Sequence, residues 1–179
     1  GKADPSTLKA LYANDAPKNS QTAPDAANTG DDGDDGDGGG STTDKLPDNP
    51  TRSDKIEYAI YIGQQQLGKP YVYGATGPNS FDCSGFTTYC FKKVGVSLGR
   101  SAYAQGYNNG TKVESLSEMQ RGDIVCMNTI SDSDLVDHVG IYLENGKFIH
   151  SASNGKTVTI SHLDEDYWRT HYAGGRRVF

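Results

Sequence analysis

Three side chains in this sequence have the types and contexts needed for nucleophilic catalysis: one cysteine and two histidines. Cys83 lies in the run 81–85, Phe-Asp-Cys-Ser-Gly, where a segment rich in Gly and Pro gives way to a helical pattern. His138 and His150 lie downstream in strand-like contexts. A thiol nucleophile, a base that takes its proton and a third group that orients the base form a complete set. The sequence therefore predicts a cysteine hydrolase.

The position of Cys83 at the start of a helix bears on its ionisation. The first helical turn carries unpaired N–H groups and a partial positive charge, so we expect the thiolate to be favoured over the thiol. Cys90 lies two turns further along the same helix, about 10 Å away at Cα. This exceeds the limit of about 7 Å for a disulfide. Cys126 has the pattern of a strand residue facing a core, so we expect three free cysteines.

The connection between the two histidine strands decides whether the rings can cooperate. A strict two-residue turn would point them to opposite faces of the sheet. A three-residue loop over 144–146, with Gly146 left-handed, puts His138 and His150 on one face, about 7–8 Å apart at Cα. Gly140 then lies opposite His150 and leaves room for its ring. We predict the three-residue loop.

These positions assign the roles. Cys83 is the nucleophile, His138 the general base, and His150 the group that holds the His138 ring and its tautomer. Backbone N–H groups at the helix start, including that of Cys83, would meet the oxyanion. Each residue alone is more often structural, and a zinc site built from the three is a chemical alternative. The chain lacks the close ligand pairs typical of zinc sites, so we expect no metal and no other cofactor.

Two helices are expected before the strands. Apolar residues at helical spacing between Ile56 and Leu67 predict a first helix, capped by Asp54 with Glu57 and ended by Gly68. A second helix should run over 83–94. Strand patterns follow at 123–127, 137–143, 147–152, 156–161 and 172–178. Helices followed by antiparallel strands indicate an α+β fold with a five- to six-stranded sheet.

The charge is unevenly distributed along the 179 residues. Residues 1–50 hold four Lys and ten Asp, so the net charge of −6 belongs to them, while 51–179 hold 13 basic and 13 acidic residues. A neutral domain argues against nucleic acid as partner, and no apolar stretch approaches the roughly 20 residues of a membrane span. We expect residues 1–15 to be the remnant of an upstream module, 16–50 an acidic Gly/Asp-rich disordered linker, and 51–179 the catalytic domain.

From about Thr51 to Phe179 the chain resembles the NlpC family of bacterial cell-wall cysteine peptidases, which have a papain-like core. The order and spacing of several short segments carry the resemblance. These segments are 68–74, 81–86, 120–125, 138–142, 148–150, 167–168 and 175–178.

The resemblance implies a substrate and a compartment. It implies hydrolysis of peptidoglycan stem peptides at the D-γ-glutamyl–diamino acid bond, through a thioester acyl-enzyme, by an extracellular, monomeric protein at the cell wall. It implies Cys83, His138 and His150 as the triad. The acidic linker would tether the domain to another wall hydrolase or a wall-binding module.

The resemblance also implies a substrate-binding set. Tyr71 would assist the oxyanion or bind substrate, whereas Tyr73 is expected to pack. Asp82 and Ser84 would line the substrate groove, although Asp82 read from the sequence alone is equally a helix cap. Two further residues, Arg100 and Ser101, would face substrate.

Other functions remain open at this point. An amidase or another thiol acyltransferase would use the same sulfur on a different bond. A wall-binding module that keeps the fold without turnover belongs to a different class, and the intact catalytic set argues against it.

Overall fold

The computed structural model describes residues 45–130, 135–153 and 156–179. The expected upstream remnant (1–15) and most of the expected linker (16–50) lie outside the described residues.

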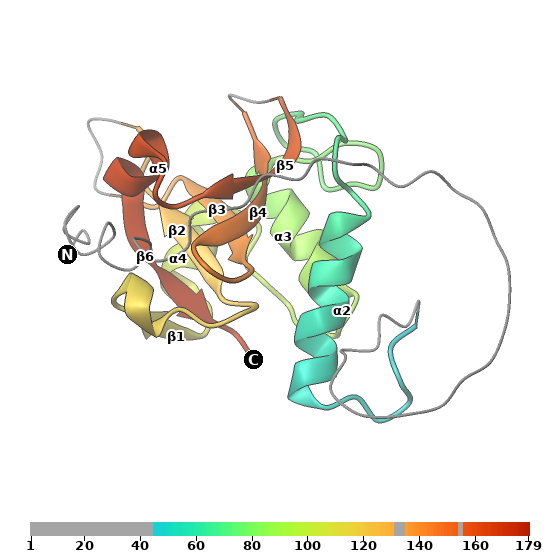
Figure 1. Ribbon diagram of the computed structural model, residues 1–179. Helices are drawn as coiled ribbons and strands as arrows, with labels where there is room; N and C mark the ends of the chain where they lie inside the picture. The colour runs from blue at the N-terminus through green and yellow to red at the C-terminus, as the bar shows by residue number, and fades with distance from the viewer. Residues whose placement is uncertain (1–44, 131–134, 154–155) are drawn as a thin grey trace, which may run out of the picture.

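The longer helices precede a single antiparallel sheet, and two short helical segments fall between its strands along the chain, which confirms the α+β prediction (Figure 1). The sheet has six strands in the order β1-β6-β2-β3-β4-β5. The helices are α2 (Arg52–Gln64), α3 (Cys83–Lys92), α4 (Ala102–Asn108), α5 (Asp166–His171) and the short 3-10 helix η1 (Leu116–Glu118). The strands are β1 (Thr111–Val113), β2 (Ile124–Met127), β3 (His138–Tyr142), β4 (Lys147–Ala152), β5 (Thr157–His162) and β6 (Tyr172–Arg177).

The two faces of the sheet are buried in two separate hydrophobic clusters. Alternate residues of each central strand belong to different clusters, as the two-residue period of a strand requires. Val139 and Ile141 of β3 face the cluster built with Phe86 and Phe91 of α3. The opposite face joins a second cluster that contains Trp168 of α5. The central strands β2, β3 and β4 are therefore buried almost throughout.

The start of α2 differs from the prediction in its capping residue. Thr51, not Asp54, is the N-cap: its hydroxyl accepts from the Asp54 N–H at 3.1 Å, and the Asp54 carboxylate accepts from the Thr51 N–H at 2.8 Å. This is a reciprocal capping box. Glu57 instead pairs with Arg121, at 2.6 Å. The expected use of Asp54 and Glu57 as the cap is therefore wrong.

The hairpin between β3 and β4 has the predicted register. Ile141 pairs with Ile149 and Tyr142 with Phe148. The backbone of Leu143 bonds that of Lys147, so residues 144–146 form the loop. Gly146 is left-handed as predicted, with φ 74°, and so is its neighbour Asn145, with φ 47°.

The ladder between β3 and β4 has two pairs, and the start of α3 contacts the two strands next to it. On one side, the Ser151 hydroxyl of β4 donates to the carbonyl of Phe81 at 2.9 Å. On the other side, the sulfur of Cys83 lies 3.9 Å from the carbonyl oxygen of Asp137, just before β3. The N-terminus of α3 is thus bound to both strands.

Among the described residues, none of the helices combines the length and the apolar character needed to span a bilayer.

Candidate active site

Cys83 is the first residue of α3, and the residues around it explain why the helix begins there. The Asp82 side chain is the N-cap and accepts from the N–H of Gly85 at 2.6 Å. A side chain at position 85 would meet the Ala75 carbonyl oxygen at 2.1 Å and the Asp82 carboxylate at 2.8 Å. Only glycine fits there, so the sequence Asp-Cys-Ser-Gly fixes both the helix start and the position of the thiol.

The thiol lies against the backbone on both sides of His138. Its sulfur approaches the Asp137 carbonyl oxygen at 3.9 Å. The backbone N–H groups of Val139, Ser84 and Cys83 itself are directed at the sulfur, and each favours the charged form. These donors belong to the helix start and to the start of β3. The N–H groups at the helix start are the ones expected from the sequence to meet the oxyanion.

The two histidines lie on one face of the sheet, as predicted from the loop length. Nε2 of His138 is 2.8 Å from Nδ1 of His150, and the rings are nearly perpendicular, at 88°. A Cβ atom at Gly140 would lie 3.0 Å from the Cβ of His150, so glycine is required opposite that ring. Both histidines are buried, His150 completely.

Two residues complete the surroundings of this pair. Nε2 of His150 lies 3.0 Å from the hydroxyl oxygen of Ser161 on β5. The indole of Trp168 stacks on the His138 ring, with centroids 5.5 Å apart and the planes at 24°. Ser161 was not singled out from the sequence, because a lone serine on a strand carries no signal and only the register of β4 with β5 brings it to His150.

The hydrogen bond between the rings assigns the nitrogen atoms. Because Nε2 of His138 is engaged with His150, Nδ1 is the nitrogen left to exchange a proton with a thiol. In the arrangement where His138 donates from Nε2, Nδ1 of His150 accepts, so the proton of His150 sits on Nε2 and is donated to Ser161. The geometry thus forms a continuous chain from Ser161 to His138.

Burial favours the neutral forms of the two histidines and of the Cys83 thiol. It lowers the pKa of His138 to about 4, and it lowers that of His150 well below the ordinary range, with the His138 charge adding to the effect. Burial also raises the pKa of the Cys83 thiol, and the adjacent Asp82 carboxylate raises it further. The expectation that the helix start would favour a thiolate is wrong, because loss of hydration outweighs the helix N-terminus here.

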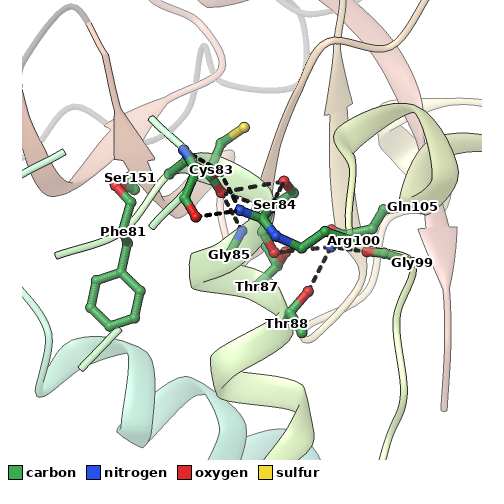
Figure 2. A network of polar contacts seen from close by, with 12 residues as sticks. Phe81, Cys83, Ser84, Gly85, Thr87, Thr88, Gly99, Arg100, Gln105 and Ser151 are labelled. Atoms are coloured by element: carbon green, nitrogen blue, oxygen red, sulfur yellow. Dashed lines mark hydrogen bonds and ion pairs between the residues drawn. The ribbon is translucent and has the colours of Figure 1, made fainter. Parts of the chain in front are cut away.

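The expected substrate-binding residues fall into two groups. Asp82, Ser84 and Arg100 form one polar network at the start of α3 (Figure 2). Tyr71 is half-buried and close enough to Cys83 and Asp82 that, after burial itself, their charges raise the pKa of its phenol. It therefore lies near the thiol, where the resemblance places it.

The remaining expected residue, Ser101, is exposed and caps α4, where its hydroxyl accepts from the N–H of Ala104 at 3.1 Å. Tyr73 does not pack as expected, because 91% of its surface is exposed.

The structure also reveals Gln105 as a residue that the sequence analysis missed. It is completely buried on α4. Its amide nitrogen donates to the carbonyl oxygens of Ser84 (3.0 Å) and Gly99 (2.8 Å) and to the Thr88 hydroxyl (3.0 Å), and its amide oxygen accepts from Thr87 at 2.6 Å (Figure 2). The residue binds α4 and the segment before it to α3. A glutamine in a short helix gives no sequence signal for this role.

The zinc alternative gains no support from the geometry. Within the described ranges, no cluster of three or more His, Cys, Asp or Glu side chains is arranged to hold a metal ion. The cysteines Cys83, Cys90 and Cys126 are all free, which confirms the expectation of no disulfide.

A thiol at a helix N-terminus, held against the backbone on both sides of a histidine, is the arrangement expected of a cysteine peptidase. The model of the NlpC/P60 family matches residues 68–177. The chain belongs to the NlpC/P60 family.

Curated relatives and solved structures agree with this assignment. The chain is 39% identical over 124 residues to the probable endopeptidase YafL of Escherichia coli (strain K12), and the match covers 68% of this chain and 49% of YafL. It is 41% identical over 116 residues to the murein DD-endopeptidase MepH of the same strain, which covers 64% of the chain and 42% of MepH. The chain thus spans half or less of the length of these relatives.

Among solved structures, NlpC1 from Trichomonas vaginalis is similar, with a TM-score of 0.63 and 32% identity. The match covers 68% of this chain and 43% of that one. The sequence resemblance to the NlpC family is therefore confirmed at the level of fold and family.

Proposed function

We propose that this chain is a cysteine endopeptidase that hydrolyses peptidoglycan stem peptides, with Cys83, His138 and His150 as its triad. The observation that supports it most is the hydrogen-bonded histidine pair, at 2.8 Å, beside a thiol that lies against the backbone of β3. Residues 51–179 form the catalytic domain in this proposal, and the linker over 16–50 tethers it to a further module at the cell wall.

The reaction begins from a neutral thiol and a neutral imidazole. As the sulfur attacks the carbonyl carbon, Nδ1 of His138 takes the thiol proton, and the charge on His138 is stabilised through its bond to His150. The oxyanion forms beside the N–H groups at the start of α3, and Tyr71 adds a donor or a substrate contact. These groups act where negative charge develops.

The rest of the cycle returns the proton. The intermediate collapses, the C–N bond breaks, and His138 gives its proton to the leaving amine, which leaves a thioester on Cys83. His138 then takes a proton from water as the water oxygen attacks the thioester. The carbon–sulfur bond breaks, the carboxylic product leaves, and His138 returns its proton to the sulfur. Asp82, Ser84, Arg100 and Ser101 are the proposed neighbours of the substrate; the first three form one polar network at the start of α3.

The bond that is cleaved has two candidates. The resemblance to the NlpC family favours the D-γ-glutamyl–diamino acid bond. The name of MepH, a DD-endopeptidase, favours the D,D bond of the peptide cross-link.

One experiment separates these bonds from each other and from an amidase. The chain is incubated with defined muropeptides, both monomeric and cross-linked, and products are weighed by mass spectrometry. Cleavage within a monomeric stem after D-glutamate is the expected result. Separation of cross-linked dimers into intact monomers would indicate the D,D bond, and release of an intact stem peptide from the sugar would indicate an amidase. Cys83→Ala is the control and should yield no product; no turnover by the parent chain would overturn the proposal.

A further inference from the structure

Arg100 makes four polar contacts: three go to Asp82 and Ser84 at the start of α3, and one goes to Gly74 in the segment before it. Its Nη1 donates to Asp82 Oδ1 at 3.2 Å and to the Ser84 hydroxyl at 3.1 Å. Its Nη2 donates to Asp82 Oδ2 and to the Gly74 carbonyl oxygen, both at 2.8 Å. Although 48% of the side chain is exposed, both terminal nitrogens are committed to this network (Figure 2).

The partner carboxylate is held in place independently of Arg100. Oδ1 of Asp82 accepts from the N–H of Gly85 at 2.6 Å, and Oδ2 accepts from that of Gly74 at 2.9 Å. Only 9% of the Asp82 side chain is exposed. Removal of the guanidinium would therefore leave a poorly hydrated negative charge on the residue that directly precedes Cys83. Such a charge opposes ionisation of the sulfur.

Gln105 fixes the segment that carries Arg100. Its amide donates to the carbonyl oxygens of both Gly99 and Ser84, so residues 99–100 and the start of α3 are bound to one buried group. The guanidinium is thereby kept over Asp82. A flexible arginine that searches for substrate would not need this support.

We propose that Arg100 is a positioning residue for the nucleophile: it neutralises the Asp82 carboxylate and thereby allows negative charge to form on the sulfur of Cys83. This goes beyond a substrate contact, and it rests on Cys83 being the nucleophile of the proposed function. The charge of Arg100 is close enough to interact with that of Cys83.

Several titratable or charged groups surround the thiol and enter any pH profile. Tyr71 lies on the segment before α3, and Asp82 and Arg100 flank the helix start. From β3 comes His138, and behind it His150 of β4. Of these, Asp82 and Arg100 are the pair whose charges can be removed separately or together without touching the histidines.

The test measures the alkylation rate of Cys83 by iodoacetamide between pH 5 and 11, read by intact mass and peptide mapping. Cys90 and Cys126 are 0% and 2% exposed, so labelling of the folded chain reports on Cys83. Arg100→Gln should raise the midpoint of the profile by about one pH unit, because a charge lost at close range shifts a thiol by this order. Asp82→Asn, which keeps a capping side chain, should lower the midpoint.

The double variant Asp82→Asn/Arg100→Gln tests whether Arg100 acts on Cys83 through the charge of Asp82. If the positioning role holds, its midpoint returns close to that of the parent chain, since both charges are absent. Arg100→Lys keeps the charge without the four-contact geometry, so its midpoint should rise by less than half as much. Arg121→Gln breaks a comparable pair, with Glu57 at 2.6 Å, and serves as the matched control.

Two outcomes would overturn the inference. One is an unchanged midpoint in Arg100→Gln together with a loss of turnover carried entirely by KM, which would make Arg100 a substrate contact. The other is a double variant whose midpoint stays as high as that of Arg100→Gln. If Arg100→Gln does not fold, as judged by circular dichroism, the midpoints of Arg100→Lys and the double variant decide alone. Alkylation requires no substrate, so failure of the proposed peptidase activity is seen separately from failure of this inference.

Discussion

Nε2 of His138 lies 2.8 Å from Nδ1 of His150, and the two rings meet at 88°. The edge of one ring therefore points into the lone-pair direction of the other. This single contact determines which nitrogen of His138 is available to the thiol and which nitrogen of His150 must be satisfied elsewhere. Together with the contact between His150 and Ser161, it links Ser161, His150 and His138 by consecutive hydrogen bonds.

His150 should be replaceable in part by a side chain that still accepts a hydrogen bond. In His150→Gln the amide oxygen can accept from Nε2 of His138, so we expect kcat to fall about 10-fold, whereas His150→Ala should lose 100-fold or more, about 3 kcal/mol of transition-state stabilisation. The measurement is kcat on a soluble stem peptide for both variants. Equal losses would show that the third residue does not act through this hydrogen bond.

Ser161 should support His150 from the other side. Ser161→Ala removes the acceptor for the Nε2 proton, and we expect kcat to fall by about 3- to 10-fold, in line with a net hydrogen-bond contribution of about 1 kcal/mol. Ser161→Thr keeps the hydroxyl and should retain most activity. Thr159→Ala, two residues away on the same strand, is the control for general damage to β5. Full activity of Ser161→Ala would mean that this bond does not order the pair.

The buried histidines should make the fold sensitive to acid. Burial lowers the pKa of His138 to about 4 and moves that of His150 in the same direction. An unfolded histidine titrates near 6.5, so the unfolded chain binds protons first as the pH falls. Stability is thus full above pH 6.5 and is lost between about 6.5 and 4.

Urea unfolding at pH 8 and pH 5 measures this loss. For His138 alone we expect about 2 kcal/mol less stability at pH 5. The variant His138→Gln carries no titrating ring and should lose correspondingly less between the two pH values. An identical loss in parent and variant would contradict the assignment of the effect to His138.

Gly140 should tolerate no side chain. A Cβ there would lie 2.8 Å from Phe148 Cδ2, 2.9 Å from the Ile149 carbonyl oxygen and 3.0 Å from His150 Cβ. Gly140→Ala should therefore cost about 1–3 kcal/mol of stability by overpacking and reduce kcat by displacing His150. Thermal melting and kcat are measured together. Gly95→Ala, at a left-handed position with open space around it, should lower stability without changing kcat.

The sequence was sufficient for the parts of the site set by local rules. Phe-Asp-Cys-Ser-Gly predicted the helix start because a cap and a glycine act within four residues. The length of the loop over 144–146 predicted the shared face of the histidines, because strand side chains alternate strictly. The helix start is borne out by α3, which begins at Cys83 with Asp82 as its N-cap. The shared face is borne out by the pairing of Ile141 with Ile149 and by the contact between the rings.

Other features of the fold and the site could not be predicted, because they depend on burial and on residues distant in the sequence. The ionisation of Cys83 was predicted in the wrong direction, because hydration of the sulfur depends on the whole fold. The short elements β1, α4 and α5 were not predicted, since three to seven residues show no periodicity. Ser161 and Gln105 could not be found because their roles depend on partners that are distant in the sequence, His150 at 11 residues and Ser84 at 21 residues.

The order of strands in the sheet has a consequence for biosynthesis. Strand β6 comes after every other strand in the chain yet lies between β1 and β2. A nascent polypeptide that has emerged only as far as β5 already contains Cys83, His138 and His150, but β2 still lacks the partner on its other edge. A ribosome that stops before residue 172 would therefore release a chain with all three reactive groups and an incomplete scaffold, so we expect hydrolytic competence only after β6 has been synthesised.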